Sequence, residues 1–137
     1  MVSISKINKN FQTIEKYLKV LDEFKIDSSE VLENNIKDSL AVSMSCFTIL
    51  NAVIEIGESL ITIKDLEFPS TYKEIFSILG KNKILSKKLS LELEKYMYLR
   101  NMLAHQYDDM EYDKIYDLYV NREIFRKFIV ESKIYFN

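Results

Sequence analysis

Glycine and proline are almost absent from this sequence, which holds two glycines and one proline among 137 residues. Tight turns and hairpins need these residue types, because glycine reaches positive φ and proline presets a turn. Sandwiches and barrels, which depend on many such turns, are therefore disfavoured. Apolar residues make up 47% of the chain, enough to form a core and to exclude disorder. The sequence predicts a single all-α domain over residues 1–137, an antiparallel bundle of four to five helices.

Five stretches show apolar residues at three- and four-residue steps, the period of one helix face. We expect helices over residues 5–24, 28–65, 72–80, 86–107 and 112–135. The second should be the buried spine of the domain, because residues 40–63 are apolar on most sides. Gly57 within it indicates a close crossing with another helix. Asn121 is the point at which the last helix could break.

Two helix starts carry the spacing of a capping box, in which an N-terminal polar side chain and a later Glu satisfy free backbone N–H groups. Asp27 and Glu30 would begin the second helix, and Thr71 and Glu74 the third. Pro69 favours the same start for the third helix, because proline disfavours helix at the residue before it.

Charge and cysteine content limit the class of protein. The single cysteine, Cys46, excludes an intrachain disulfide and lies in an apolar run, which favours a buried thiol in a reducing compartment. We find no uncharged apolar run of eighteen residues and no signal peptide, so we expect a soluble cytoplasmic protein without a membrane partner. A net charge of −2 lacks the basic surface of a broad nucleic-acid binder, although a local cleft can still be basic.

Residues 98–107 (YLRNMLAHQY) contain the only histidine and form the strongest candidate site. A helix advances about 100° per residue, which puts the polar members of this stretch on one broad face. These are Arg100, Asn101, His105 and Tyr107. Leu99, Met102 and Leu103 lie on the opposite face and should point into the bundle. Ala104 lies in the middle of the polar face, where a small side chain leaves room for a substrate or a second chain.

The residue types on this face have a narrow chemistry. Histidine exchanges a proton near neutral pH, and the guanidinium fork of arginine suits phosphate oxygens. Without a metal they suit cleavage of RNA by its own 2′-hydroxyl, which needs a base and an acid on opposite sides of the phosphorus. One chain has one histidine, so a two-fold dimer would supply both groups. The same residue types are common on solvated helix surfaces, and type and spacing alone favour that plainer interpretation.

A resemblance to a known family adds to this. The stretch R-N-x-L-A-H-x-Y resembles the Arg-x4-His-x-Tyr signature of the HEPN superfamily, and more specifically of HepT-like toxins. Residues 50–61 (LNAVIEIGESLI) resemble the long second helix of that family, and residues 68–85 (FPSTYKEIFSILGKNKIL) the segment that leads to the motif helix. The acidic and aromatic stretch after the motif is similar too, with Glu111 where many relatives carry Asp. The resemblance covers most of the chain in order.

The resemblance implies a HEPN-type homodimer whose two motifs face a shared cleft. It also implies a metal-independent endoribonuclease, the toxin of a type VII toxin–antitoxin pair, with no cofactor. Arg100 would bind and stabilise the phosphate, His105 would be the acid–base catalyst, and Asn101 would support that pair. The implied partner is a minimal nucleotidyltransferase (MNT) antitoxin that adds AMP to Tyr107. RNA would be the substrate, with tRNA as one candidate.

Two other functions remain open from the sequence. One is a non-catalytic HEPN partner or regulatory module that binds a nucleotidyltransferase or a nucleotide, which the low positive charge favours. The other is a helical dimerisation domain without chemistry. We expect the acidic residues Asp108, Asp109 and Glu111 to be solvated or to cap a helix rather than to bind a metal, with antitoxin docking as an alternative. Other conspicuous side chains are expected to pack in the core or an interface: Tyr112, Tyr116, Tyr119, Met97 and Met102.

Overall fold

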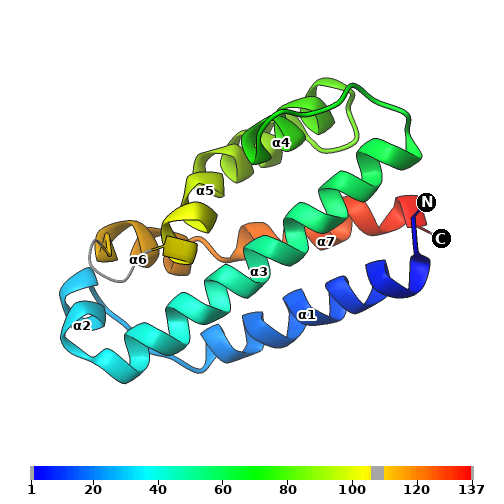
Figure 1. Ribbon diagram of the computed structural model, residues 1–137. Helices are drawn as coiled ribbons and strands as arrows, with labels where there is room; N and C mark the ends of the chain where they lie inside the picture. Colours follow the sequence, from blue (N-terminus) through cyan, green and yellow to red (C-terminus); the bar gives the residue numbers. More distant parts are fainter. Residues whose placement is uncertain (1, 106–109, 137) are drawn as a thin grey trace.

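The computed structural model describes residues 2–105 and 110–136, and every regular element in these two ranges is a helix (Figure 1). They are α1 (Ile4–Asp22), α2 (Ser29–Asn34), α3 (Ile36–Ile63), α4 (Tyr72–Lys81), α5 (Lys87–His105), α6 (Tyr112–Val120), α7 (Glu123–Lys133) and a short 3-10 helix, η1 (Ile134–Phe136). The long helices run antiparallel to their neighbours around a common core. The predicted all-α antiparallel bundle is confirmed.

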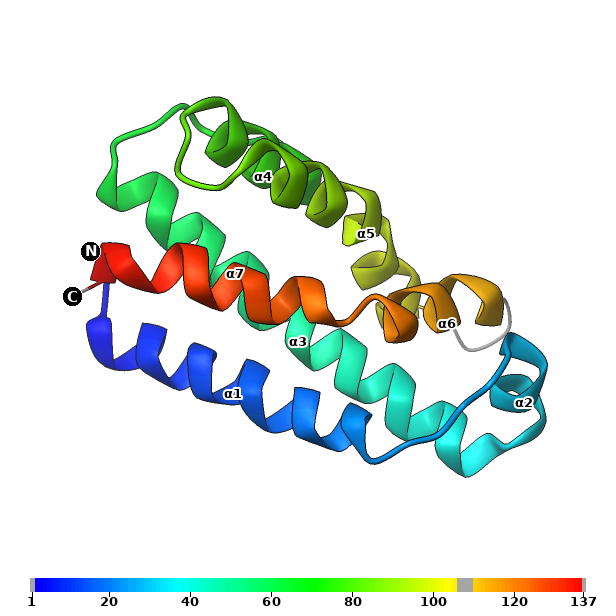
Figure 2. The ribbon, with the colours of Figure 1, turned by 180° about the vertical axis from the view of Figure 1, so that it is seen from behind.

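Helix α3 is the spine of this bundle, as the apolar pattern predicts. It contacts α1, α2, α4, α5, α6 and α7, and half of its 28 residues are buried. In Figures 1 and 2 it crosses the whole length of the molecule, with α1 on one side, the α4–α5 pair on the other, and α7 between them behind α3 in the view of Figure 1. By length and composition α3 could also cross a membrane, but 61% of its most apolar window is buried against the other helices. Its apolar surface forms the core of the bundle.

The prediction of one continuous helix over 28–65 is wrong, because Asn35 divides it into α2 and α3. Asn35 has extended backbone angles, and its side-chain oxygen accepts a hydrogen bond from Asp38 N at 3.1 Å. An Asn that offers its side chain to the backbone stabilises a helix start rather than a helix interior. The predicted cap at the start of α2 is wrong as well: Ser28, and not Asp27, accepts from Val31 N at 3.2 Å.

The predicted start of the third helix and the predicted break in the last helix agree with the structure, whereas the predicted end of the motif helix at residue 107 lies outside the described residues. At the start of α4, Thr71 Oγ1 accepts from Glu74 N at 3.1 Å, and the Glu74 carboxylate accepts from Ser70 N at 2.5 Å. These are the two bonds of a capping box, except that Glu74 bonds the N–H of the residue before the cap residue Thr71. The last predicted helix breaks at Asn121, whose side-chain amide donates to Asp117 O at 2.8 Å and ends α6.

Two glycines set how closely α4 packs between α3 and α5. A Cβ placed on Gly57 of α3 would lie 2.7 Å from the Ile75 Cγ2 of α4, so the predicted close crossing is confirmed. A Cβ on Gly80 of α4 would lie 2.7 Å from the Ser90 Cβ of α5. Neither glycine has positive φ. Both are required for space: Gly57 lets α4 approach α3, and Gly80 lets the end of α4 approach the first turns of α5.

Candidate active site

Helix α5 carries Arg100, Asn101 and His105, and its first turn is held by α7. Ser86 Oγ accepts a hydrogen bond from Leu89 N at 3.3 Å. The Glu131 carboxylate of α7 accepts from Ser86 N at 2.6 Å and from Ser86 Oγ at 3.0 Å. After this first turn, one face of α5 is buried in the bundle; its buried residues are Leu89, Ser90, Leu93, Tyr96, Met97 and Leu99. These contacts fix the rotation of the helix and so the direction in which its last two turns point.

Among the motif residues that the structure describes, Arg100 makes the most side-chain contacts. It is half-buried, and its Nε donates to Asn51 Oδ1 of α3 at 2.9 Å, while Nη1 donates to Asn101 Oδ1 at 3.3 Å. Its guanidinium carbon lies 5.5 Å from the ring centroid of Phe47 and 5.3 Å from that of Tyr72, both within cation–π distance. Within the described residues these bonds use Nε and Nη1, which leaves Nη2 to bind an anion such as a phosphate oxygen.

Asn101 and His105 are both exposed on the helix that carries Arg100. The structure brings Arg100 and Asn101 together by their hydrogen bond. His105 is the last residue of α5, five residues after Arg100, which corresponds to about 7.5 Å along the helix axis. Tyr107 lies outside the described residues, as do Asp108 and Asp109, so the predictions for these positions stay predictions.

The predicted division of this helix into two faces is confirmed at its core side. Leu99 is fully buried, and Met102 and Leu103 are half-buried against the core cluster. Ala104 is half-buried, so this part of the polar face is not simply open to solvent.

Three residues that hold Arg100 are absent from the predictions. Asn51 has the only side-chain amide among the residues of α3, in a mostly apolar stretch, and that was the signal that could have singled it out. Phe47 lies one turn before Asn51 and has no distinguishing signal among the other apolar residues. Tyr72 comes from α4, and only the packing of α4 on α5 brings it to Arg100.

Electrostatics near the site follow from burial and from nearby carboxylates. Burial, together with the charge of Glu55, raises the pKa of the Glu58 carboxyl on α3, and Lys6 partly offsets this. Burial and the carboxylates of Glu111, Asp113 and Asp117 raise the pKa of Tyr98 on α5. Tyr98 therefore keeps its neutral hydroxyl at physiological pH. Among residues 2–105 and 110–136 we find no group of three or more side chains arranged to hold a metal ion.

Side chains predicted to be structural are so in the structure. Tyr119 is buried, and its hydroxyl donates to Phe24 O at 2.7 Å. Met97 is buried, and Tyr112, Tyr116 and Met102 pack half-buried on the core. Cys46 is fully buried, which raises the pKa of its thiol to about 12 and makes it a poor nucleophile.

Comparison with known proteins shows relatives over most of the chain. An mRNA nuclease HepT of Shewanella oneidensis is 26% identical over 108 residues, 78% of this chain and 79% of the relative. A tRNA nuclease HepT of Aphanizomenon flos-aquae is 26% identical over 110 residues, 80% of this chain and 75% of the relative. Among solved structures, the chain is similar to a tri-AMPylated Shewanella oneidensis HEPN toxin in complex with MNT antitoxin. The TM-score is 0.82 at 24% identity, and the match covers 98% of this chain and 99% of that one, which shows that the two have the same fold. Residues 14–131 match the family described as ribonuclease HepT-like. The chain belongs to this HepT-like family, and its bundle is of the HEPN type.

Proposed function

We propose that this chain is the ribonuclease toxin of a toxin–antitoxin pair, acts in the cytoplasm, and cleaves RNA without a metal at Arg100 and His105. The observation that carries the proposal is the guanidinium of Arg100, which Asn51, Phe47 and Tyr72 hold in place on the same helix as the exposed His105. The two HepT relatives named as nucleases of mRNA and tRNA support RNA as the substrate, with tRNA as one candidate.

The reaction needs few groups beyond these two. The 2′-hydroxyl of RNA attacks the neighbouring phosphorus, the bond from phosphorus to the 5′-oxygen breaks, and the products are a 2′,3′-cyclic phosphate and a free 5′-hydroxyl. A base takes the proton of the 2′-hydroxyl, and an acid gives one to the departing 5′-oxygen. Arg100 binds the phosphate and stabilises the charge that builds up on its oxygens. His105 serves as base or acid, and Asn101 helps to orient Arg100 through their hydrogen bond.

A homodimer would complete this chemistry, since each chain contributes one histidine. The structure offers a surface for it. Ile36, Leu40 and Met44 are 67%, 61% and 59% exposed and recur every four residues along α3, which makes a continuous apolar stripe. One turn further along the same face is Phe47, which contacts Arg100. We propose that a second copy of the chain covers this stripe, so that the two Arg100 side chains face one cleft.

The partner enzyme would act on the residue just past α5. We propose that an MNT antitoxin adds AMP to Tyr107, two residues after His105. Solved structures of related toxins with their antitoxins, one of them tri-AMPylated, support this regulation. Each added nucleotide would place negative charge and bulk beside the site that an RNA phosphate must enter, and would block cleavage.

The decisive experiment measures RNA cleavage by the purified chain in EDTA. The unmodified protein should cleave, and Arg100→Ala and His105→Ala should each lower the rate by about a hundredfold or more, the usual contribution of a charge-stabilising or acid–base group. Lys127→Ala, an exposed cation on α7, is the matched control and should cleave normally. Full RNA cleavage by His105→Ala would contradict the proposed role of His105 in catalysis. Binding of the antitoxin with no cleavage in any AMP-free state would favour the non-catalytic partner instead.

A further inference from the structure

A groove of about 580 Å³ opens beside Arg100, between the start of α4 and the middle of α5. Its wall includes Tyr72 and Asn101, two of the four residues that contact the Arg100 guanidinium. The groove therefore begins where the proposed phosphate-binding side chain ends. A second groove of about 480 Å³ lies on the α3 side of the same two residues, and Glu58 lines it.

The larger groove combines aromatic, hydrogen-bonding and cationic groups. Tyr72 comes from α4 and Tyr98, 45% exposed, from α5, so two aromatic rings belong to its lining. Lys73 and Lys95 also line it, together with one carboxylate, Glu94, and Lys95 Nζ lies 3.3 Å from Asp117 Oδ2 outside the lining. The volume lies within the range of about 300–1,000 Å³ that is usual for small-ligand sites.

Asn101 supplies a directional contact at the inner end of this groove. Its side-chain oxygen accepts from Arg100 Nη1, and among the described residues we find no partner for its amide nitrogen. The amide can therefore donate to a ligand in the groove. This assigns Asn101 a second role beside the support of Arg100.

We propose that this groove binds one unpaired nucleotide of the RNA substrate, the nucleotide next to the phosphate held by Arg100. The base would stack on the tyrosine rings, and Lys73 would hold the phosphate that follows, while Lys95 is shared between that phosphate and Asp117. A paired base cannot offer its face to a protein side chain, so the site selects single-stranded RNA. The carboxylate of Glu58 makes the second groove less suitable for a phosphate. This inference rests on the proposed function, because it takes RNA as the ligand.

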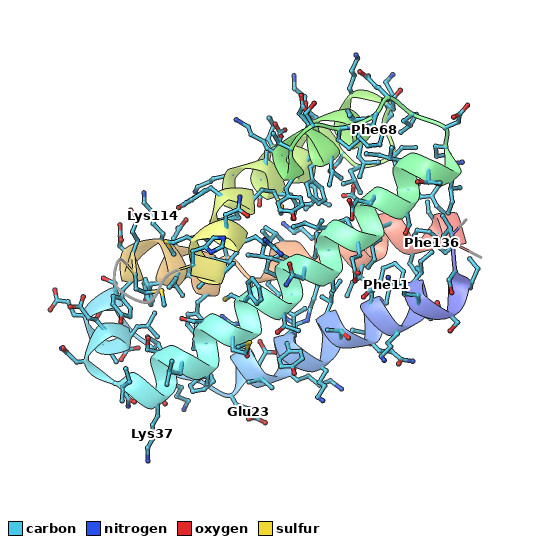
Figure 3. All side chains as sticks on the ribbon, in the orientation of Figure 1. Phe11, Glu23, Lys37, Phe68, Lys114 and Phe136 are labelled. Atoms are coloured by element: carbon cyan, nitrogen blue, oxygen red, sulfur yellow. The ribbon has the colours of Figure 1, made fainter. Side chains whose placement is uncertain are left out.

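Outside the groove, the same end of the molecule carries one more exposed aromatic residue. Phe68 lies on the segment that precedes α4 (Figure 3), and its side chain is 93% exposed. It directly precedes Pro69, which lines the second groove. A binding experiment must therefore distinguish a base that stacks on Tyr98 from RNA that contacts any exposed aromatic ring.

The chain has no tryptophan, so a single indole can report on the groove. In Tyr98→Trp the indole enters the groove, and in the control Tyr17→Trp it lies on α1, on the other side of the bundle (Figure 1). The probe is a 2′-O-methyl oligoribonucleotide, which lacks the attacking hydroxyl and cannot be cleaved. We expect its binding to quench the fluorescence of Tyr98→Trp and to leave Tyr17→Trp and a Phe68→Trp variant nearly unchanged.

Affinity gives a second, independent measurement. Tyr98→Ala should weaken binding of the same probe about tenfold, the cost of one lost base–aromatic stack, whereas Tyr98→Phe should bind normally. Probe binding with quenching but no cleavage of ordinary RNA would support the groove and overturn the proposed function. Cleavage of ordinary RNA, with no quenching and with normal affinity in Tyr98→Ala, would overturn the groove and leave the proposed function intact. Absence of both binding and cleavage would overturn the two together.

Discussion

At the scale of single residues, the contact between Asn51 and Arg100 decides how well the site is organised. The Nε–Oδ1 distance of 2.9 Å joins residues 49 positions apart, and the donor is charged. A hydrogen bond to a charged group contributes about 1.5–3 kcal/mol, so its loss should free the guanidinium to leave the position between Phe47 and Tyr72. Asn51 is in this sense a positioning residue and not a catalytic one.

We predict that Asn51→Ala lowers the rate of RNA cleavage roughly tenfold to a hundredfold, through a guanidinium that is no longer aimed at the phosphate. Steady-state kinetics on one RNA substrate would measure it, with Asn8→Ala on the exposed face of α1 as the control. The double variant separates a positioning role from a purely structural effect. If Asn51 acts through Arg100, Asn51→Ala should lower the cleavage rate no further in an Arg100→Ala background. An additive loss in that background would refute the positioning role.

The sequence could predict only part of this site, and the reason is the distance along the chain between its members. Arg100, Asn101 and His105 lie on one helix, so their common side follows from the helical angle alone. Asn51 and Tyr72 reach Arg100 through the packing of α3 and α4 on α5. Periodicity indicates which side of each helix is buried, but not how far one helix is shifted along another.

At the scale of elements, the existence of the helices was easier to predict than their ends. The apolar period runs without interruption through Asn35, yet the Asn35 side chain satisfies Asp38 N and starts a new helix there. That outcome depends on a local competition between side-chain and backbone hydrogen bonds, which hydrophobic periodicity does not report. At Asn121 a polar residue coincides with a gap in the apolar pattern. The helix break predicted there is found in the structure.

The close contact of α4 and α5 at Gly80 leads to a stability prediction. Gly80→Ala should lower the free energy of unfolding by about 1–3 kcal/mol, because its Cβ would overlap Ser90, although alanine itself favours helix by about 1 kcal/mol. Urea denaturation would measure it, with Ser77→Ala on the exposed face of α4 as the control. If overlap is the cause, Gly80→Ala combined with Ser90→Gly should lose less than the sum of the two single changes. Strict additivity would show that the two positions do not compete for space.

The end of α1 is joined to α7 by Asp22, which gives a prediction in pH. Arg122 Nε lies 2.9 Å from Asp22 Oδ1, and Arg126 Nη2 lies 2.6 Å from Asp22 Oδ2. Burial alone would raise the pKa of Asp22, but the hydrogen bonds and charges of the two arginines outweigh it and lower that pKa below 3.8. Folding therefore favours the charged carboxylate, so the stabilisation is present above pH 3.8 and is lost as the pH falls through the lowered value.

Asp22→Asn should accordingly lower the thermal midpoint at pH 7 by roughly 2–4 °C. This corresponds to about 0.5–1 kcal/mol, a modest value because the three side chains are partly exposed and screened by solvent. Calorimetry from pH 7 down to pH 2 would measure the difference from the wild type, which should shrink below pH 3.8. Asp65→Asn, which removes a carboxylate on the exposed segment after α3, is the control. A difference that stays constant with pH would mean that the ion pairs are not its source.

At the scale of the whole molecule, the exposed stripe of Ile36, Leu40 and Met44 is the feature that a monomer leaves unexplained. We predict that Leu40→Lys gives a folded monomer, because a charge at the centre of the stripe would have to be buried on association. Sedimentation equilibrium should find a dimer for the wild type and for Val130→Lys, an equally exposed apolar position on α7. Cleavage should fall together with dimerisation. A Leu40→Lys protein that stays dimeric would place the interface elsewhere.

A dimer with one histidine in each chain could carry out a single reaction shared by both copies. If the base and the acid are the His105 side chains of both protomers, a mixed dimer of wild type and His105→Ala has only one of them. Tandem purification on two different tags isolates that mixed dimer, and it should cleave RNA about a hundredfold or more slowly than the wild type, since each acid–base group contributes that much. A mixed dimer of wild type and Lys127→Ala should be fully active. A mixed dimer with half the wild-type rate would mean that each protomer cleaves independently, so the single histidine of each chain would be its whole acid–base apparatus.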